Sequence, residues 1–235
     1  MKKEISQRRR AKQSGQEFLE FGLVALLLIP LLLGSIVTGL GLIKSSQANH
    51  ICRDMANMYI LGGDFSTYNM QQLAQRLATG MNLQIGSSFA GNNRANTGNG
   101  GDGLVTVSQI MWIGGTTGAK CQGVLPATCT NASKFVFTQR LQFGNGSLTW
   151  PNSLGNPAPS SISSSGLIAN FVTDSGAQVP SAGQASMVAL WNSGANGTAP
   201  LADGQVAYVV EVYFQTPSLS FGIYQNPGVY SRWFF

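Results

Sequence analysis

The residue with the most unusual position in this sequence is Glu20, a carboxylate that lies directly before a long apolar run. An isolated acid inside a membrane span costs about 2.5–3.5 kcal/mol on insertion scales, less near the interface, and is functional by default. Two arrangements reduce this cost. Glu20 can pair with an amine, or it can reach headgroup water at the interface. Its chemistry is therefore that of a partner in an ion pair or of a solvated interfacial acid.

The apolar run itself extends from Phe21 to Ile43, 23 residues without a charge. About 20 such residues cross a hydrocarbon core, so the run predicts a transmembrane helix. A cleavable secretory signal is the alternative, because the segment "SQA" ending at Ala48 contains the small residues of a cleavage site. The run is longer than the 7–15 apolar residues of a signal core, which favours a retained span.

Small residues in the second half of this run predict close lateral packing of the helix. Gly34 with Thr38, and Ser35 with Gly39, form two small-x-x-x-small pairs. This spacing lets neighbouring membrane helices approach closely. Gly is also common in membrane helices in general, so the pattern alone does not identify a partner.

The positive charge of the chain is concentrated at its N-terminus. The sequence has 14 Lys and Arg against 9 Asp and Glu, and residues 1–15 hold six of the basic residues and one acid. The rest of the chain therefore carries eight of each sign and a net charge of zero. A nucleic-acid partner is not expected, because no basic face remains to hold a phosphate backbone. By the positive-inside rule the basic head stays in the cytoplasm and residues after Lys44 are exported.

The three cysteines fit an oxidising compartment. Cys121 and Cys129 enclose seven residues, and a disulfide between them would close a small ring. Metal binding is the alternative for this pair, but no second pair exists and the one histidine, His50, is far away in sequence. Cys52 is expected to be a buried helical thiol or, as an alternative, an intermolecular link. No metal and no cofactor are expected.

Two helices are predicted after the span. Residues 45–61 read as a continuation of the membrane helix that ends at Gly62-Gly63. Its apolar face is either Ile51, Met55, Met58 and Leu61 or Ile51, Met55 and Tyr59. Residues 66–81 predict a second, short helix, whose proposed apolar face consists of Met70, Leu73, Leu77 and Met81.

Three strands are predicted in the remainder, at residues 104–113, 134–143 and 204–217. In the second strand, alternation places Phe135, Phe137, Leu141 and Phe143 on one face. In the third, it places Val206, Tyr208, Val210, Val212 and Phe214 on one face and Glu211 and Tyr213 on the other. Glu211 is expected to face outward or to pair with Arg140 or Arg232. Residues 144–204, rich in Gly, Ser, Asn and Pro, are expected to form a surface loop, with residues 186–191 as a short strand or helical turn.

Together these elements predict an α+β fold, in which a long N-terminal helix packs on a small antiparallel sheet with long loops. An enzyme is not expected. The exported part has one histidine, no acid pair at short spacing and no G-x-S-x-G segment, and its serines lie in loops without a suitable base.

Two segments carry a resemblance to a known family: "GQEFLEFGLVALLLIPLLLG" near the start, and "VAYVVEVYFQTP" followed by "YSRWFF" near the end. The chain resembles the TadE-like proteins, minor pilins or pseudopilins of the tight-adherence (Tad) branch of type IV pilus machinery. Major pilins of this branch are very short and have Tyr after the acid. Here Phe21 follows Glu20 and a large domain is attached, which favours a minor component over the main filament subunit.

The resemblance implies that a prepilin peptidase cuts between Gly15 and Gln16, leaving 220 residues of the 235. The new α-amino group of Gln16 would lie one helical turn from Glu20, since i and i+4 groups are neighbours on a helix. In pilins the amine that pairs with this acid is usually assigned to an adjacent subunit. The implied domains are a leader at 1–15, a transmembrane helix at 16–44 and an exported pilin-like domain at 45–235.

The implied setting is the bacterial inner membrane, with a cytoplasmic N-terminus and the bulk of the chain outside, or an extracellular pilus. The implied partners are the prepilin peptidase, other pilin-like subunits, inner-membrane pilus assembly proteins and the lipid bilayer. The alternative is a single-span, membrane-anchored binding or adhesion domain whose leader is not processed.

Overall fold

The computed structural model describes residues 2–85, 101–115, 121–123, 128–193, 202–216 and 228–235, with the backbone alone for 2–17, 192 and 193. The chain divides into two compact units, Met1–Ile43 and Lys44–Phe235, and each is described by itself.

The first unit is helical throughout its described residues. It belongs to α1, which extends over Lys2–Ile60 and includes Pro30. Between Phe18 and Ile43 most large apolar side chains are exposed, from 39% for Leu33 to 78% for Leu26, and Val37 is half-buried. Their window of 18 residues has a mean hydropathy of 2.5, so this helix is long and apolar enough to cross a membrane.

The end of α1 follows from its two glycines. Gly62 has a φ of +89°, a backbone conformation that glycine adopts without strain. The N–H groups of Leu61, Gly62 and Gly63 then bond to the carbonyls of Asn57, Tyr59 and Met58. These bonds satisfy the last carbonyls of the helix, and the predicted stop at Gly62-Gly63 is confirmed.

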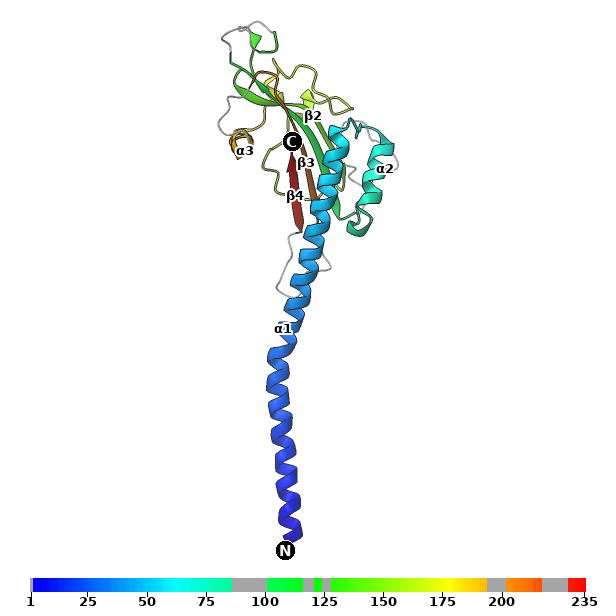
Figure 1. The fold of residues 1–235 in the computed structure, drawn as a ribbon, viewed down its shortest axis with the longest axis vertical. Helices are drawn as coiled ribbons and strands as arrows, with labels where there is room; N and C mark the ends of the chain where they lie inside the picture. The colour runs from blue at the N-terminus through cyan, green and yellow to red at the C-terminus, as the bar shows by residue number, and fades with distance from the viewer. Residues whose placement is uncertain (1, 86–100, 116–120, 124–127, 194–201, 217–227) are drawn as a thin grey trace. The chain divides into compact units, whose positions relative to one another are not determined.

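The second unit is built around a four-stranded antiparallel sheet with the order β2-β1-β3-β4. Its strands are β1 (Gly103–Ile113), β2 (Lys134–Gly144), β3 (Val206–Phe214) and β4 (Val229–Phe234). The α+β fold and the first three strands are confirmed, and Figure 1 shows the sheet beside the C-terminal part of α1. β4 was not predicted as a strand.

One face of the sheet packs against the C-terminal part of α1. The helix buries small and flexible side chains there: Ala48, Ile51, Cys52, Met55, Ala56 and Tyr59. The sheet contributes Val105, Val107, Leu141, Phe143, Val210, Val212 and Phe214. Of the two apolar faces predicted for residues 45–61, the one with Tyr59 is confirmed, because Leu61 is 86% exposed.

The short helix α2 (Tyr68–Leu77) exists, but only part of its predicted apolar face is confirmed: Met81 is buried and Met70 packs against the core. Leu73 and Leu77 are 41% and 43% exposed, whereas Gln71, Ala74 and Ala78 are buried. The alanines let the helix approach the core closely. The Gln71 amide is satisfied there, because its Nε2 donates to the carbonyl of Phe65 at 2.8 Å.

A β-bulge in β2 corrects the predicted face of that strand. Gln109 pairs with Gln139 and Ile110 with Phe137, so Thr138 is an extra residue in β2. The bulge reverses the alternation. Leu141 and Phe143 face α1, while Phe135 and Phe137 belong to the cluster on the other face of the sheet. The prediction of one four-residue apolar face is therefore wrong.

This second face is covered mainly by residues 144–193, so the prediction of a surface loop for that region is wrong. Leu154, Ile168, Val172, Ala177 and Val179 are buried against the sheet. The segment contains two short 3-10 helices (Pro159–Ser161 and Ser175–Ala177) and α3 (Ser181–Ser193). The predicted strand or helical turn at 186–191 thus belongs to a longer helix. Both faces of the sheet are closed by the chain itself.

Candidate functional site

The sequence-predicted processing site lies on one continuous helix. Gly15, Gln16 and Glu20 all belong to α1, so Gln16 and Glu20 are separated by one helical turn along the backbone. The side chains of Gly15 and Gln16 lie outside the described residues. Glu20 is exposed on the helix surface, at the start of the exposed apolar region. The backbone thus has the spacing that pairing of an amine with Glu20 requires.

The small residues of the span leave an open helix surface. A Cβ added at Gly34 or Gly39 would meet nothing within 4 Å. The Ser35 hydroxyl donates to the Leu32 carbonyl at 2.8 Å, and the Thr38 hydroxyl donates to the carbonyl of Gly34 at 2.9 Å. Because both hydroxyls are satisfied within their own helix, they can face lipid or a neighbouring helix without the cost of an unpaired polar group.

The predicted disulfide is present. Cys121 and Cys129 are bonded to each other, with their Cα atoms 6.2 Å apart. Because each sulfur is the other's partner, the pair is not a metal site. Among the described residues, no cluster of three or more His, Cys, Asp or Glu side chains is placed to bind a metal ion.

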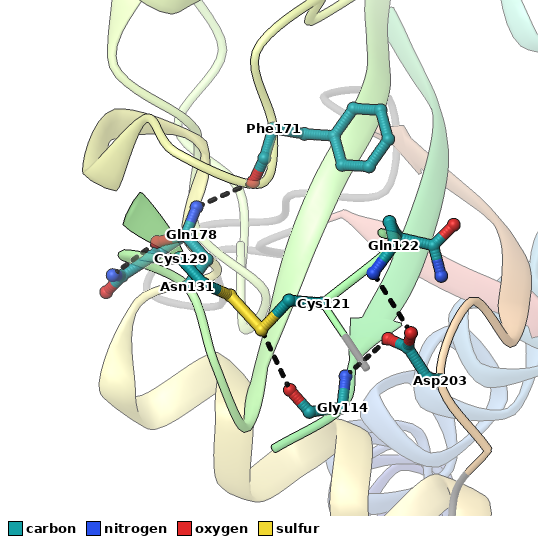
Figure 2. The surroundings of a disulfide bond; sticks show 8 residues. All are labelled: Gly114, Cys121, Gln122, Cys129, Asn131, Phe171, Gln178 and Asp203. Carbon is teal, nitrogen blue, oxygen red and sulfur yellow. Dashed lines mark hydrogen bonds between the residues drawn. A yellow bond between two sulfur atoms is a disulfide. The ribbon is translucent and has the colours of Figure 1, made fainter. Parts of the chain in front are cut away.

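The disulfide stands where three segments of the second unit meet (Figure 2). The Asp203 carboxylate accepts hydrogen bonds from the backbone N–H of Gly114 at 2.6 Å and of Gln122 at 3.0 Å. The Asn131 amide donates to the carbonyls of Phe171 and Asp174, at 2.6 and 2.7 Å. Hydrogen bonds beside the bridge therefore join the end of β1 to the loop before β3, and Asn131 to the segment that covers the second sheet face. The role of the bridge is structural.

A buried ion pair lies on that second face. Arg140 Nη1 is 3.2 Å from Glu211 Oε2, and their side chains are only 2% and 0% exposed. The Arg140 alternative predicted for Glu211 is thus confirmed, while Arg232 donates to the Ser153 hydroxyl instead. Desolvation lowers the pKa of Arg140, and the neighbouring Glu211 carboxylate raises it again in part.

Hydrogen bonds from several segments complete this pair. Arg140 also donates to the Ser108 hydroxyl at 2.6 Å and to the side-chain oxygens of Asn152 and Asn156. The Tyr230 hydroxyl donates to Glu211 Oε1 at 2.6 Å. Burial and the adjacent carboxylate raise the pKa of Tyr230, which keeps it protonated as a donor. The network links the covering segment to the sheet and β4 to β3, and both charges have hydrogen-bonded partners.

Cys52 and His50 occupy the positions expected of them on α1. Cys52 is fully buried, and its thiol donates to the carbonyl of Val210 at 3.2 Å. Burial raises the pKa of this thiol to about 12, so it is not a nucleophile at neutral pH. His50 is exposed. Neither residue has the surroundings of a catalytic group.

A cavity that sequence reasoning missed lies at the junction of α1, the sheet and the covering segment. Its volume is about 410 Å³. Its lining includes a row of half-buried polar residues across three strands: Gln139, Gln109 and Tyr208. Tyr59 also lines it, and the Tyr59 hydroxyl donates to Gln139 Oε1 at 2.7 Å.

The rim of this cavity comes from two loops. The turn after α1 contributes Gly62, Gly63, Asp64 and Ser66, and the covering segment contributes Ser165 and Leu167. The sequence does hold one signal for the cavity. Gln109 and Gln139 are polar residues at positions where their strands otherwise present apolar side chains to α1. The bulge at Thr138 hides this signal in β2, because it shifts Gln139 onto the α1 side.

Neither models of protein families, nor curated protein sequences, nor solved structures give a match to this chain.

Proposed function

We propose that this chain is a membrane-inserted minor pilin or pseudopilin that contributes to the assembly or anchoring of a Tad-type or type IV-like pilus. A prepilin peptidase removes residues 1–15, and the mature chain begins at Gln16. The observation that carries the proposal is the placement of Gly15, Gln16 and Glu20 on one uninterrupted helix, directly before an exposed apolar surface.

In this proposal the new amino group neutralises Glu20 in the membrane. Gln16 and Glu20 lie four positions apart. When neighbouring helices pack in close register, the amine of one subunit can therefore meet the carboxylate of the next. Pairing offsets the cost of about 2.5–3.5 kcal/mol for an acid within a span. A subunit that packs out of register leaves its Glu20 unpaired and keeps this free-energy cost. Glu20 therefore sets the register of the assembly.

The exposed apolar surface between Phe18 and Ile43 requires lipid or other spans around it, because water would not solvate it. The basic residues within 1–15 place the leader in the cytoplasm, and residues after Lys44 lie outside. A disulfide between Cys121 and Cys129 fits that oxidising side.

The experiment compares Glu20→Ala with Glu17→Ala, a second acid in the same segment, in cells that assemble the pilus. We expect both variants to be cleaved after Gly15. Glu20→Ala should be lost from the sheared filament fraction and from the inner-membrane assembly complex, whereas Glu17→Ala should be retained in both at the wild-type level. Normal recovery of Glu20→Ala would contradict the proposal.

A second candidate function is a single-span, membrane-anchored binding domain. The observation that favours it is the cavity between Tyr59, Gln109 and Gln139, which a purely structural subunit does not need. This candidate predicts that purified protein keeps Met1 in the presence of the peptidase.

A further inference from the structure

The cavity between Tyr59 and the polar row has a lining that indicates its ligand. The face of the sheet that packs on α1 is otherwise apolar, with side chains such as Val105 and Val107. At Gln109 this face of the sheet becomes polar. Gln109 pairs in register with Gln139 on one side and with Tyr208 on the other. A polar row beside an apolar core is costly if it is fully buried, and these three residues are only half-buried because they face the cavity.

Hydrogen-bonding capacity remains open in this row. The Tyr59 hydroxyl donates to Gln139 Oε1 at 2.7 Å, which fixes the amide and leaves its two N–H donors for a ligand. Gln109 Nε2 is 3.4 Å from the Tyr208 hydroxyl, a long contact that a better acceptor can replace. At the rim, Asp64 Oδ1 accepts from the backbone N–H of Ser66, and its second oxygen can accept from a ligand.

The charge of the lining excludes an anionic ligand. Asp64 is the one charged residue among the ten that line the cavity, and none of the ten is basic. A phosphate or carboxylate would therefore face a carboxylate without a counter-ion. The rings of Tyr59 and Tyr208 are in direct edge-to-face contact, with centroids 5.3 Å apart, so no cation fits between them.

We propose that this cavity binds one or two linked residues of a neutral saccharide. Sugar hydroxyls both donate and accept, and they match a lining of two amides, two phenols, two serines and one carboxylate. Leu167, which is 51% exposed, offers apolar surface to the C–H face of a sugar ring. The volume of about 410 Å³ lies in the range of small-ligand sites.

One structural feature supports a prepared site. The bulge at Thr138 brings Gln139 onto the same face as Gln109, and bulges are frequent next to functional sites because they re-aim side chains. The saccharide site goes beyond the pilin function and does not rest on it.

The test is saturation-transfer NMR on the full chain in lipid nanodiscs. The probes are the methyl glycosides of glucose, galactose, mannose and N-acetylglucosamine, with glucose 6-phosphate and choline as charged probes. We expect at least one neutral glycoside to bind with a Kd of about 1 mM, the affinity of a small ligand at ordinary ligand efficiency. Glucose 6-phosphate and choline should bind more weakly than that glycoside.

Three variants locate the binding. Gln139→Ala should weaken it by about tenfold, the loss of hydrogen bonds to one amide. Gln142→Ala, the matched control on the same strand, should leave the affinity unchanged because Gln142 hydrogen-bonds to Thr106 on the other face of the sheet. Ser165→Trp fills the cavity from a loop and should abolish binding while the sheet stays folded.

Three results would overturn the proposal. They are no saturation transfer from any of the four glycosides to the folded wild-type chain, unchanged affinity in Gln139→Ala or Ser165→Trp, and tighter binding of glucose 6-phosphate or choline than of every neutral glycoside.

Discussion

The two units of this chain meet their surroundings in opposite ways. In Met1–Ile43 the described apolar side chains lie on the outside of a helix, and none of the candidate span window is buried within the protein. In Lys44–Phe235 both faces of the sheet are covered, and its two core clusters are closed by the chain itself. The same helix α1 contributes to both units, but with different side chains.

This difference shows which unit finds its apolar contacts within the chain and which unit needs them from its surroundings. The described part of the second unit holds its own core, a disulfide and a satisfied buried ion pair, so we expect this unit to fold by itself. The first unit exposes residues such as Leu26 and Leu31, and it needs lipid or neighbouring helices. Changes in each unit should therefore affect different measurements.

The largest effect is expected where the second unit closes its outer sheet face. Arg140→Met leaves Glu211 buried without its counter-charge, which should lower the free energy of unfolding by about 3–5 kcal/mol. Tryptophan fluorescence in denaturant reports on this unit alone, because all four tryptophans lie after Lys44. The double variant Arg140→Met with Glu211→Leu should recover most of the loss. A double variant as unstable as the single one would show that the pair itself stabilises the fold.

A cavity in the α1-facing core should have the next largest effect. Met55 is fully buried between α1 and the sheet, and Met55→Ala should cost about 2–5 kcal/mol. Leu26→Ala removes a side chain of similar size that is 78% exposed in the first unit, and the same fluorescence transition should not move. Equal shifts for the two variants would contradict the division into units.

A charge in the first unit should act on membrane insertion. Leu27→Arg places a cation within the apolar region, five residues before its midpoint at Leu32, at a cost of up to about 2.5–3.5 kcal/mol. We expect a large fraction of this variant to be lost from the membrane fraction. Asn57→Arg adds the same charge to an exposed site in the second unit and should leave the distribution unchanged. Full membrane recovery of Leu27→Arg would argue that the segment does not span.

The smallest effect is a dependence of stability on alkaline pH. Burial raises the pKa of Cys52 from 9.0 to about 12, so the unfolded chain loses this proton first. Its contribution to stability is present below pH 9 and is lost as the pH rises, by at most about 1.4 kcal/mol per pH unit. Tyr59 and Tyr230, whose pKa values are also raised by burial, add to the loss above pH 10.

Denaturation midpoints between pH 7 and pH 11 test this linkage. In Cys52→Ala the decline that begins near pH 9 should disappear, while the decline above pH 10 remains. Stability that increases from pH 9 to pH 10 in the wild type would contradict the buried position of the thiol.

The sequence predicted the features that depend on local periodicity. The apolar length of α1, its end at Gly62 and the alternation of β3 needed only neighbouring residues. The bulge at Thr138 could not be predicted this way, because Phe135, Phe137, Leu141 and Phe143 keep the same two-residue spacing on both sides of it. The apolar face of α2 was predicted wrongly in part, because Ala74 and Ala78 pack close to the core and the larger leucines remain exposed.

The candidate sites also differ in whether the sequence alone predicts them. Gly15, Gln16, Glu20 and the cysteine pair stand out through residue type and spacing. The cavity depends on three strands and two loops that are distant in sequence, and only the folded sheet aligns Gln109 with Gln139 and Tyr208. The covering role of residues 144–193 was also hidden, because their polar composition masks scattered buried residues such as Leu154 and Ile168.

The most direct test of the central claim is the mass of the chain purified from cells with and without the cognate prepilin peptidase. The account predicts a mature chain of 220 residues that begins at Gln16 when the peptidase is present, and the uncut chain of 235 residues when it is absent or when Gly15 is replaced by Ala. A chain that still begins at Met1 in the presence of the peptidase, or one that begins at Asn49 after signal cleavage, would contradict it.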